Sequence, residues 1–273
     1  MKNNHSNART VLIIGAGAAG LMAGIRAAEK DPNRQVLIAE RMERPGRKLL
    51  ITGKGRCNVT NCCTIEEFMP NVLTNPRFLY SSLNALSPYE VMGFFEECGV
   101  PLKVERGERV FPVSYHSSDI VNALVQKAKD SGCRFLYNCR IKELLLEQTD
   151  DGQTVRGALT EGGEKILADA VIVATGGKSY PATGSTGDGY QLARQAGHRV
   201  TPLRPSLIPL VCKEKYCRDM MGLSLKNVTL RVVDTQSGKE VFSELGEMLF
   251  THFGVSGPLV LSASCHMQSD KNG

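Results

Sequence analysis

Six residues near the N-terminus, Gly15-Ala16-Gly17-Ala18-Ala19-Gly20, have the spacing of a phosphate-binding turn. Glycine in the first position permits a tight turn, in the second lets phosphates approach the backbone, and in the third lets a helix pack closely on a strand. The turn lies between an apolar run at 10–15 and a segment at 18–30 with helical apolar spacing. A helix that begins here offers free N–H groups to an anion. The pattern therefore predicts a site for the pyrophosphate of a dinucleotide.

Glu40 adds a second group to this predicted site. It ends the apolar segment 35–40, which is expected to be a strand, and follows Gly20 by twenty residues. A carboxylate at this place accepts hydrogen bonds from both ribose hydroxyls of a dinucleotide and disfavours a 2′-phosphorylated ligand. Residues 10–40 are thus predicted to form a strand–helix–strand unit that binds a dinucleotide.

The segment 41–56 is strongly basic, with six basic residues and one acidic residue in a chain of net charge +5. Three interpretations stay open: a solvated loop, contacts with the cofactor pyrophosphate or an anionic substrate, and contacts with RNA. No aromatic side chain in this segment could stack on a base. The basic residues are Arg41, Arg44, Arg47, Lys48, Lys54 and Arg56.

The nine cysteines are irregularly spaced, which fits free thiols in a reducing compartment rather than a disulfide framework. No C-x-x-C or H-x-x-x-H motif is present, so no metal site is predicted. Cys57 and Cys62 have the spacing of a flavin disulfide reductase pair. That alternative requires a second dinucleotide-binding turn, which the sequence lacks. The other cysteines are expected to pack in the core or lie inert at the surface.

The remaining pattern predicts an α/β protein with two kinds of sheet. A helix is expected at 76–98, interrupted at Ser87-Pro88, and another from Ser117 or Ser118 to Gly132. No regular structure is expected at 41–61. Short extended pieces are expected within 104–112, strands at 134–138, 141–147 and 154–160, a buried strand at 170–175, alternating antiparallel β runs after 202, and a helix that opens at 256–258.

Three segments, 46–61, 171–177 and 181–190, resemble the BaiN/RdsA-type flavoproteins, a family of NAD(P)/FAD-dependent oxidoreductases. Shorter matching stretches lie at 109–112, 205–210 and 249–258, so the resemblance covers nearly the whole chain. It implies that the dinucleotide is FAD in an extended conformation. A plain NAD-dependent dehydrogenase is the alternative for the same phosphate-binding turn.

The resemblance also implies which residues hold FAD. A strand that ends in two glycines, as at Gly176-Gly177, is a place where a ligand can pass close to the backbone. By position, Gly15, Gly17, Ala19 and Gly20 would cradle the pyrophosphate, and Glu40 would hold the adenosine ribose. Arg47, Lys48 and Gly53 would line the cofactor, and a residue near Ile141 would contact the adenine. Thr175, Gly176 and Gly177 would pass beside the cofactor.

The activity implied is reduction of a conjugated C=C bond, with NAD(P)H as a transient electron donor. The substrate is expected to be a small molecule such as an unsaturated steroid or bile acid, or a uridine in ribosomal RNA. Cys57 and His252 are the candidate proton donors. Lys178 and Tyr180 are expected to face the substrate cleft. A truncated, non-catalytic flavin-binding module is the alternative from a different functional class.

Residues 1–202 are predicted to form a Rossmann-like FAD-binding domain with a parallel sheet, and 203–273 an incomplete, inserted, mostly antiparallel β domain. The segment that would return to complete the first domain is expected to be missing, which predicts weak flavin retention. No apolar run approaches the length of a membrane span, and the first ten residues are polar without a secretory signal. A cytoplasmic protein with no membrane contact and no stable protein partner is expected.

Overall fold

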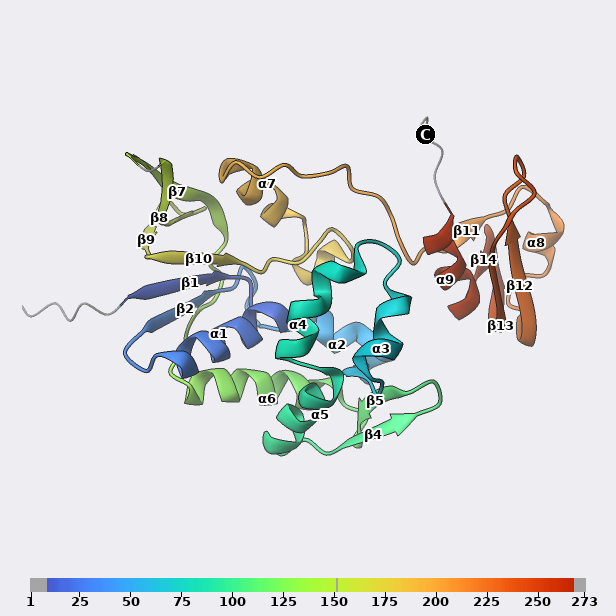
Figure 1. Cartoon of the computed structure of the whole chain (residues 1–273), viewed down its shortest axis with the longest axis horizontal. Coiled ribbons are helices and arrows are strands. Elements are labelled where there is room, and N and C mark those ends of the chain that lie inside the picture. The colour runs from blue at the N-terminus through green and yellow to red at the C-terminus, as the bar shows by residue number, and fades with distance from the viewer. Residues whose placement is uncertain (1–8, 151, 268–273) are drawn as a thin grey trace, which may run out of the picture. The chain divides into compact units, whose positions relative to one another are not determined.

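The computed structural model describes residues 9–150 and 152–267 (Figure 1). The chain divides into two compact units, Met1–Met69 with Phe78–Val200, and Pro70–Arg77 with Thr201–Gly273. Residues 70–77 join the second unit although the sequence did not suggest it. Most of the polar N-terminal segment, residues 1–8, and the last six residues of the expected β domain, 268–273, lie outside the described residues.

A four-stranded parallel sheet forms the centre of the first unit, in the order β10-β1-β2-β6. Helix α1 (Ala18–Lys30) connects β1 to β2, as the strand–helix–strand pattern predicted. The expected fold class, a Rossmann-like parallel sheet with additional antiparallel sheets, is confirmed. The parallel strands are β1 (Thr10–Ile14), β2 (Gln35–Ala39), β6 (Arg134–Leu136) and β10 (Ala170–Val173).

Side chains of β1 alternate between two apolar layers, because successive residues of a strand point to opposite faces. Val11 and Ile13 pack with α1 and α6, whereas Leu12 and Ile14 pack with α7 and a second, antiparallel sheet. Figure 1 shows α1 and α6 on one side of the parallel sheet and β7, β8 and β9 on the other. The added elements are α6 (Ser117–Asp130), α7 (Asp188–Gln195), β7 (Ile141–Thr149), β8 (Gly152–Thr160) and β9 (Lys165–Leu167).

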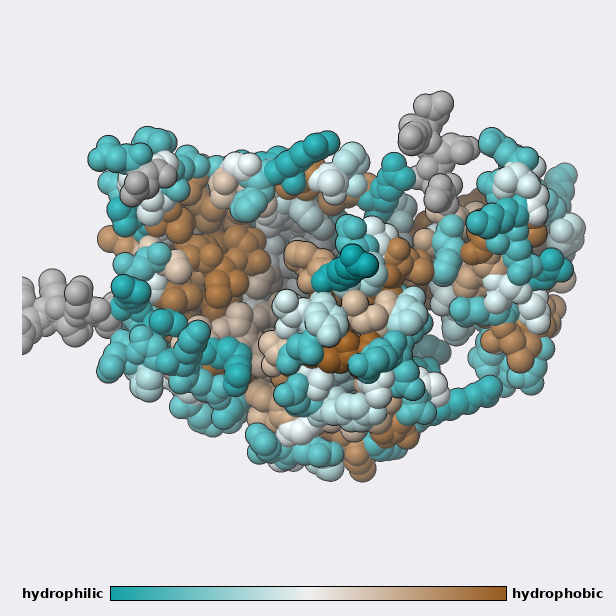
Figure 2. Space-filling view, viewed as in Figure 1, coloured by the Kyte–Doolittle hydropathy of each residue, from teal (hydrophilic) through white to brown (hydrophobic). Residues whose placement is uncertain are grey.

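Strand β10 is more exposed than the sequence predicted. Its apolar side chains Ile172 and Val173 are 38% and 41% exposed. The reason is its place at the end of the sheet, where β1 is its only paired strand among the described residues. Figure 2 shows apolar surface gathered over this part of the first unit. An apolar run identifies a strand, but it does not distinguish an edge strand from a central one.

The segment 41–61 was expected to lack regular structure, yet it contains helix α2 (Arg47–Ile51), a 3₁₀ turn (Thr52–Gly55) and strand β3 (Thr60–Asn61). These elements are too short to give a periodic apolar pattern. Strands β4 (Leu102–Glu105) and β5 (Arg109–Pro112) pair with β3 in the order β3-β5-β4.

Two predicted helix starts have different outcomes. The Ser87 hydroxyl caps helix α5 by accepting a hydrogen bond from the Glu90 backbone N–H, and Pro88 is the first residue of the helix, as predicted. Ser117 does not cap α6: the N-cap is His116, and the Ser117 hydroxyl donates to the Leu50 carbonyl, which ties α6 to α2. The helices of this region are α3 (Ile65–Phe68), α4 (Tyr80–Ala85) and α5 (Pro88–Glu97), with 3₁₀ turns at Met69–Asn71, Pro76–Leu79 and Pro181–Thr183.

The second unit is an antiparallel sheet in the order β11-β14-β13-β12, with helix α9 packed on it. Phe242, Leu259 and Ala263 form its buried core, and α9 begins at Pro258 directly after Gly257, as predicted. Within the described parts of both units, no helix is long and apolar enough to span a membrane. The elements are β11 (Leu210–Val211), α8 (Tyr216–Asp219), β12 (Ser224–Val233), β13 (Glu240–Thr251), β14 (Gly254–Ser256) and α9 (Pro258–His266).

Candidate functional site

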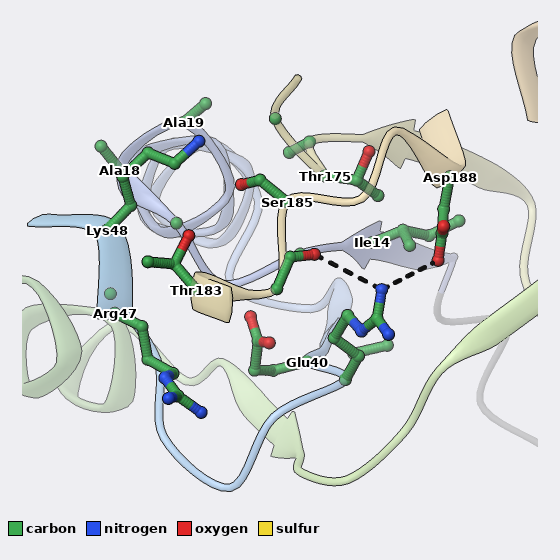
Figure 3. A pocket seen from close by; sticks show the side chains of 18 of the residues that line it. Ile14, Ala18, Ala19, Glu40, Arg47, Lys48, Thr175, Thr183, Ser185 and Asp188 are labelled. Carbon is green, nitrogen blue, oxygen red and sulfur yellow. Dashed lines mark hydrogen bonds and ion pairs between the residues drawn. The ribbon is translucent and has the colours of Figure 1, made fainter. Parts of the chain in front are cut away.

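A pocket of about 550 Å³ lies where the carboxyl ends of β1, β2 and β10 meet (Figure 3). After β1 the chain continues to β2, which pairs with one side of β1, whereas the later strand β10 pairs with the other side. The order of the strands in the sheet therefore changes direction at β1. Ligands of open α/β sheets bind at such a change of direction. The lining residues, all from the first unit, include Ile14, Gly15, Gly17, Ala18, Ala19, Glu40, Arg41, Arg44, Arg47, Lys48, Thr52, Arg140, Ile141, Thr175, Gly176, Thr183, Ser185 and Asp188.

The three glycines of the first turn differ in what surrounds them. Gly15 has φ +105°, and a Cβ there would lie 2.6 Å from the Ala174 carbonyl oxygen. A Cβ on Gly20 would overlap the carbonyl oxygen of Gly15. A Cβ on Gly17 would meet no atom within 4 Å, and Gly17 lines the pocket. The chain's own packing therefore requires Gly15 and Gly20, whereas Gly17 leaves space through which a ligand can approach the backbone.

The N-terminus of α1 faces the same space. Gly17 is its N-cap, no side chain caps it, and no acidic residue occupies its first turn. Ala18 and Ala19, whose N–H groups have no partner within a helix, line the pocket. Unpaired N–H groups together with the positive end of the helix dipole favour an anion.

Glu40 is buried, with 8% of its surface exposed, at the end of β2. One carboxylate oxygen accepts from the Ala16 N–H at 2.8 Å, and the other accepts from the Met42 N–H at 2.9 Å. Figure 3 shows the carboxylate facing the interior of the pocket. Because each carboxylate oxygen has two lone pairs, Glu40 can hold the glycine turn and still accept hydrogen bonds from a ligand.

Asp188 occupies another wall of the pocket and is held by two arginines. Arg41 donates to Thr186 at 2.5 Å and to Asp188 at 3.3 Å, and Arg140 donates to Asp188 at 3.0 Å. Burial opposes ionisation of Asp188, but hydrogen bonds from Arg140 and Thr186 and the charges of both arginines lower its pKa below the ordinary value. Sequence reasoning assigned no role to Arg140 or Asp188. The available signals for Asp188 were its place in the segment 181–190, which carries the family resemblance, and its position directly after Gly187 at the start of a helix.

The lining carries five basic and two acidic side chains. Arg41 and Arg140 are paired with Asp188, and Lys48 donates to the Ser179 hydroxyl at 3.2 Å. Within residues 9–150 and 152–267, the side chains of Arg44 and Arg47 form no hydrogen bond or ion pair. Their charges therefore remain available for an anionic ligand.

Residues 9–263 match the family model of the HI0933-like protein Rossmann domain. The chain belongs to the HI0933-like family. Among curated relatives, it is 33% identical over 261 residues to a 3-dehydro-bile acid delta(4,6)-reductase of Clostridium scindens, with 93% of this chain and 59% of that protein covered. It is 32% identical over 260 residues to a ribosomal RNA dihydrouridine synthase of Haemophilus influenzae, with 94% and 61% covered. The family resemblance inferred from sequence is confirmed.

This HI0933-like chain thus spans about three fifths of the length of the curated relatives it matches. Among solved structures, it is similar to a flavocytochrome c3 fumarate reductase, with a TM-score of 0.56, 22% identity, and 81% of this chain and 47% of that chain covered. It is also similar to a quinol fumarate reductase of Escherichia coli, with a TM-score of 0.54, 18% identity, and 80% and 43% covered. At such identity, these structures support the fold alone.

Most of the predicted cofactor residues of this HI0933-like chain lie at the pocket, and three do not line it. Gly20 packs against the turn, Gly53 lies against the Phe111 ring, and Gly177 lies near the Tyr190 hydroxyl. Lys178 and Tyr180 do not line the pocket either. The predicted residues at the pocket are Gly15, Gly17, Ala19, Glu40, Arg47, Lys48, Ile141, Thr175 and Gly176.

Cys57 and Cys62 are free thiols outside the pocket lining. Cys57 is buried in the apolar layer between the parallel sheet and its helices. Burial raises the pKa of the Cys57 thiol, against the opposing effect of a hydrogen bond with Thr52. The thiol form therefore dominates at neutral pH. Cys62 is hydrogen-bonded to the Tyr89 side chain.

His252 belongs to the second unit, in the turn between β13 and β14. Its ring packs edge-on against the Phe253 ring, with centroids 4.8 Å apart. The residues that line the pocket all belong to the first unit. The pocket lining therefore contains neither of the two proton donors that the sequence suggested.

Proposed function

We propose that the pocket binds FAD, with the adenosine diphosphate portion at the carboxyl end of β1 and β2. One observation carries this proposal: the backbone of Gly17 faces open space beside an uncapped helix N-terminus, and the buried carboxylate of Glu40 faces the same pocket. The diphosphate of a dinucleotide needs N–H donors, and its ribose hydroxyls need a hydrogen-bond acceptor close by. The helix N-terminus and Glu40 supply these two groups.

Each part of the lining has a proposed role in holding this cofactor. The N–H groups of Ala18 and Ala19 bind the pyrophosphate, and Arg44 and Arg47 neutralise its charge. Glu40 accepts hydrogen bonds from the ribose. Further contacts are proposed for Gly15, Lys48, Thr175 and Gly176 along the cofactor, and for the backbone near Ile141 at the adenine. Gly53 and Gly177, which do not line the pocket, stay proposed cofactor residues from the family resemblance alone.

The proposed reaction is NAD(P)H-linked reduction of a conjugated C=C bond. The names of the two curated relatives support it, since a delta(4,6)-reductase and a dihydrouridine synthase both imply saturation of carbon–carbon double bonds. Bound FAD would supply the two-electron chemistry, and the protein would position it. Cys57, kept as a thiol by burial, and His252 stay the proton donors proposed from the sequence, although neither lines the pocket. The substrate class is an unsaturated steroid-like molecule or a uridine in ribosomal RNA.

A ligand titration tests the cofactor assignment. The purified chain is titrated with FAD, FMN and NAD⁺, with flavin fluorescence and calorimetry as readouts. FAD is expected to bind best, because FMN lacks the adenosine half that Glu40 and the glycine turn recognise. Preference for NAD⁺ would support a nicotinamide-dependent dehydrogenase instead, and FMN binding as tight as that of FAD would contradict the role of Glu40.

A turnover assay tests the reaction separately. NADPH and NADH consumption by the FAD-loaded chain is followed with an enone steroid and with ribosomal RNA fragments. Turnover of either substrate is the expected result. FAD binding without turnover of either substrate would favour the alternative, a flavin-binding module without catalytic activity of its own.

A further inference from the structure

A second group of reactive side chains belongs to the second unit, and none of its members lines the pocket. The Sγ atoms of Cys212 and Cys217 and a carboxylate oxygen of Glu214 all lie within 4.8 Å of one another. Cys217 is buried, Cys212 is half-buried, and Glu214 is exposed. Neither the sequence pattern nor the proposed reaction gives these residues a task.

The local fold explains why residues spaced in this way converge. Cys212 follows β11 directly, and its N–H donates to the Phe253 carbonyl at 3.1 Å, which anchors it to the sheet. The chain then turns into the short helix α8, where the Cys217 N–H donates to the Glu214 carbonyl. The turn therefore brings the two thiols and the carboxylate to one side.

We propose that Cys212, Glu214 and Cys217 form a zinc-binding site. Zinc is bound by cysteine sulfur at about 2.3 Å and by carboxylate oxygen at about 2.0–2.2 Å. A tetrahedral ion with such bonds places its sulfur ligands about 3.8 Å apart. The observed spread of ligand atoms, within 4.8 Å, needs only small side-chain rotations to meet that distance. Thiolates select soft or borderline metals over Mg²⁺ and Ca²⁺, and the carboxylate favours Zn²⁺ over Cu⁺.

Three protein ligands leave one coordination position of a tetrahedral ion open to water. Because Glu214 is exposed and Cys212 is half-buried, water can reach the group. A metal here would fasten the turn after β11 to helix α8. The proposal departs from the expectation of no metal site. That expectation rested on the absence of C-x-x-C and H-x-x-x-H motifs from the sequence.

Cobalt and zinc binding by the full chain test the site. The chain is reduced with a phosphine, cleared of metal and titrated with Co²⁺, whose thiolate charge-transfer absorption reports sulfur ligands. One Co²⁺ per chain, displaced by Zn²⁺, is expected. Cys212→Ser and Cys217→Ser are expected to lose the absorption, and Glu214→Gln to weaken binding. Cys265→Ser, which removes a half-buried thiol of α9 outside the group, is the matched control and is expected to bind like the unchanged chain.

A second measurement covers the case in which Cys217→Ser, at a buried position, fails to fold. Alkylation of the unchanged chain is mapped by mass spectrometry with and without Zn²⁺. Zinc is expected to protect Cys212 and to leave Cys62 unprotected. Equal alkylation of Cys212 in both conditions would overturn the proposal. Metal retention by the Cys212→Ser variant, or a Cys212–Cys217 disulfide that forms in air and excludes Zn²⁺, would overturn it as well.

Discussion

Two walls of the pocket are both rich in polar groups, but they differ in how far those groups are satisfied. One wall, here called the α1 wall, consists of Gly17, Ala18 and Ala19 at the N-terminus of α1. Its helix N–H groups lack a capping side chain, and Gly17 faces open space. At the Asp188 wall, the carboxylate is held by Arg41 and Arg140 and by the Thr186 hydroxyl. Since pocket polar groups without a protein partner are free for a ligand, the α1 wall is where a ligand is needed. The Asp188 wall is a support that the chain completes by itself.

The largest effect is expected from Gly20→Ala, which tests whether the α1 wall depends on close packing. The added Cβ overlaps the Gly15 carbonyl oxygen, so the turn must shift. A loss of about 3 kcal/mol in the free energy of unfolding is expected, measured by urea denaturation without ligand. Gly17→Ala is the matched control and is expected to lose less than about 1 kcal/mol. Equal losses in both variants would contradict the distinction between the two glycines.

Glu40→Gln is expected to have the next largest effect. Both carboxylate oxygens accept backbone N–H groups, and a glutamine side chain would turn its NH₂ group toward one of these donors. The free energy of unfolding is expected to fall by about 2 kcal/mol. Glu43→Gln, at an exposed neighbouring position, serves as control and is expected to leave stability unchanged. An unchanged stability of Glu40→Gln would show that the carboxylate does not hold the turn.

Gly17→Val separates ligand binding from folding at the α1 wall. The side chain enters space that no protein atom occupies, so the fold is expected to tolerate it. It occupies the place proposed for the pyrophosphate, and the dissociation constant for FAD is expected to rise at least about tenfold, or 1.4 kcal/mol. Calorimetric titration of FAD measures this change. Unaltered FAD affinity would place the cofactor elsewhere.

The Asp188 wall is tested by the pH dependence of stability. The folded-state pKa of Asp188 is lowered, so its ionised form stabilises the fold above the unfolded-state pKa, and this contribution is lost as the pH falls through the folded-state value. Asp188→Asn is therefore expected to be less stable than the unchanged chain at neutral pH. The difference is expected to shrink below about pH 4 in urea denaturation series. A difference that does not vary with pH would contradict the charged pairing.

Local patterns in the sequence predicted the parts of the site that are made by neighbouring residues. The glycine turn, α1 and Glu40 all lie within one strand–helix–strand unit, whose periodicity and spacing are readable. The Asp188 wall was not predictable, because Arg41 and Asp188 are 147 positions apart and Arg140 and Asp188 are 48 apart. The exposure of β10 depends likewise on sheet order, and the convergence of Cys212 with Cys217 depends on a turn without periodicity.

Displacement of FAD by nucleotide fragments tests the central claim most directly, namely that the α1 wall binds adenosine diphosphate. The FAD-loaded chain is titrated with ADP and, in parallel, with adenosine 2′,5′-bisphosphate, while free flavin fluorescence is followed. ADP is expected to release FAD, and the 2′-phosphorylated nucleotide is expected to release little, because Glu40 repels a phosphate at the ribose. Retention of FAD at saturating ADP, or equal release by both nucleotides, would contradict this account.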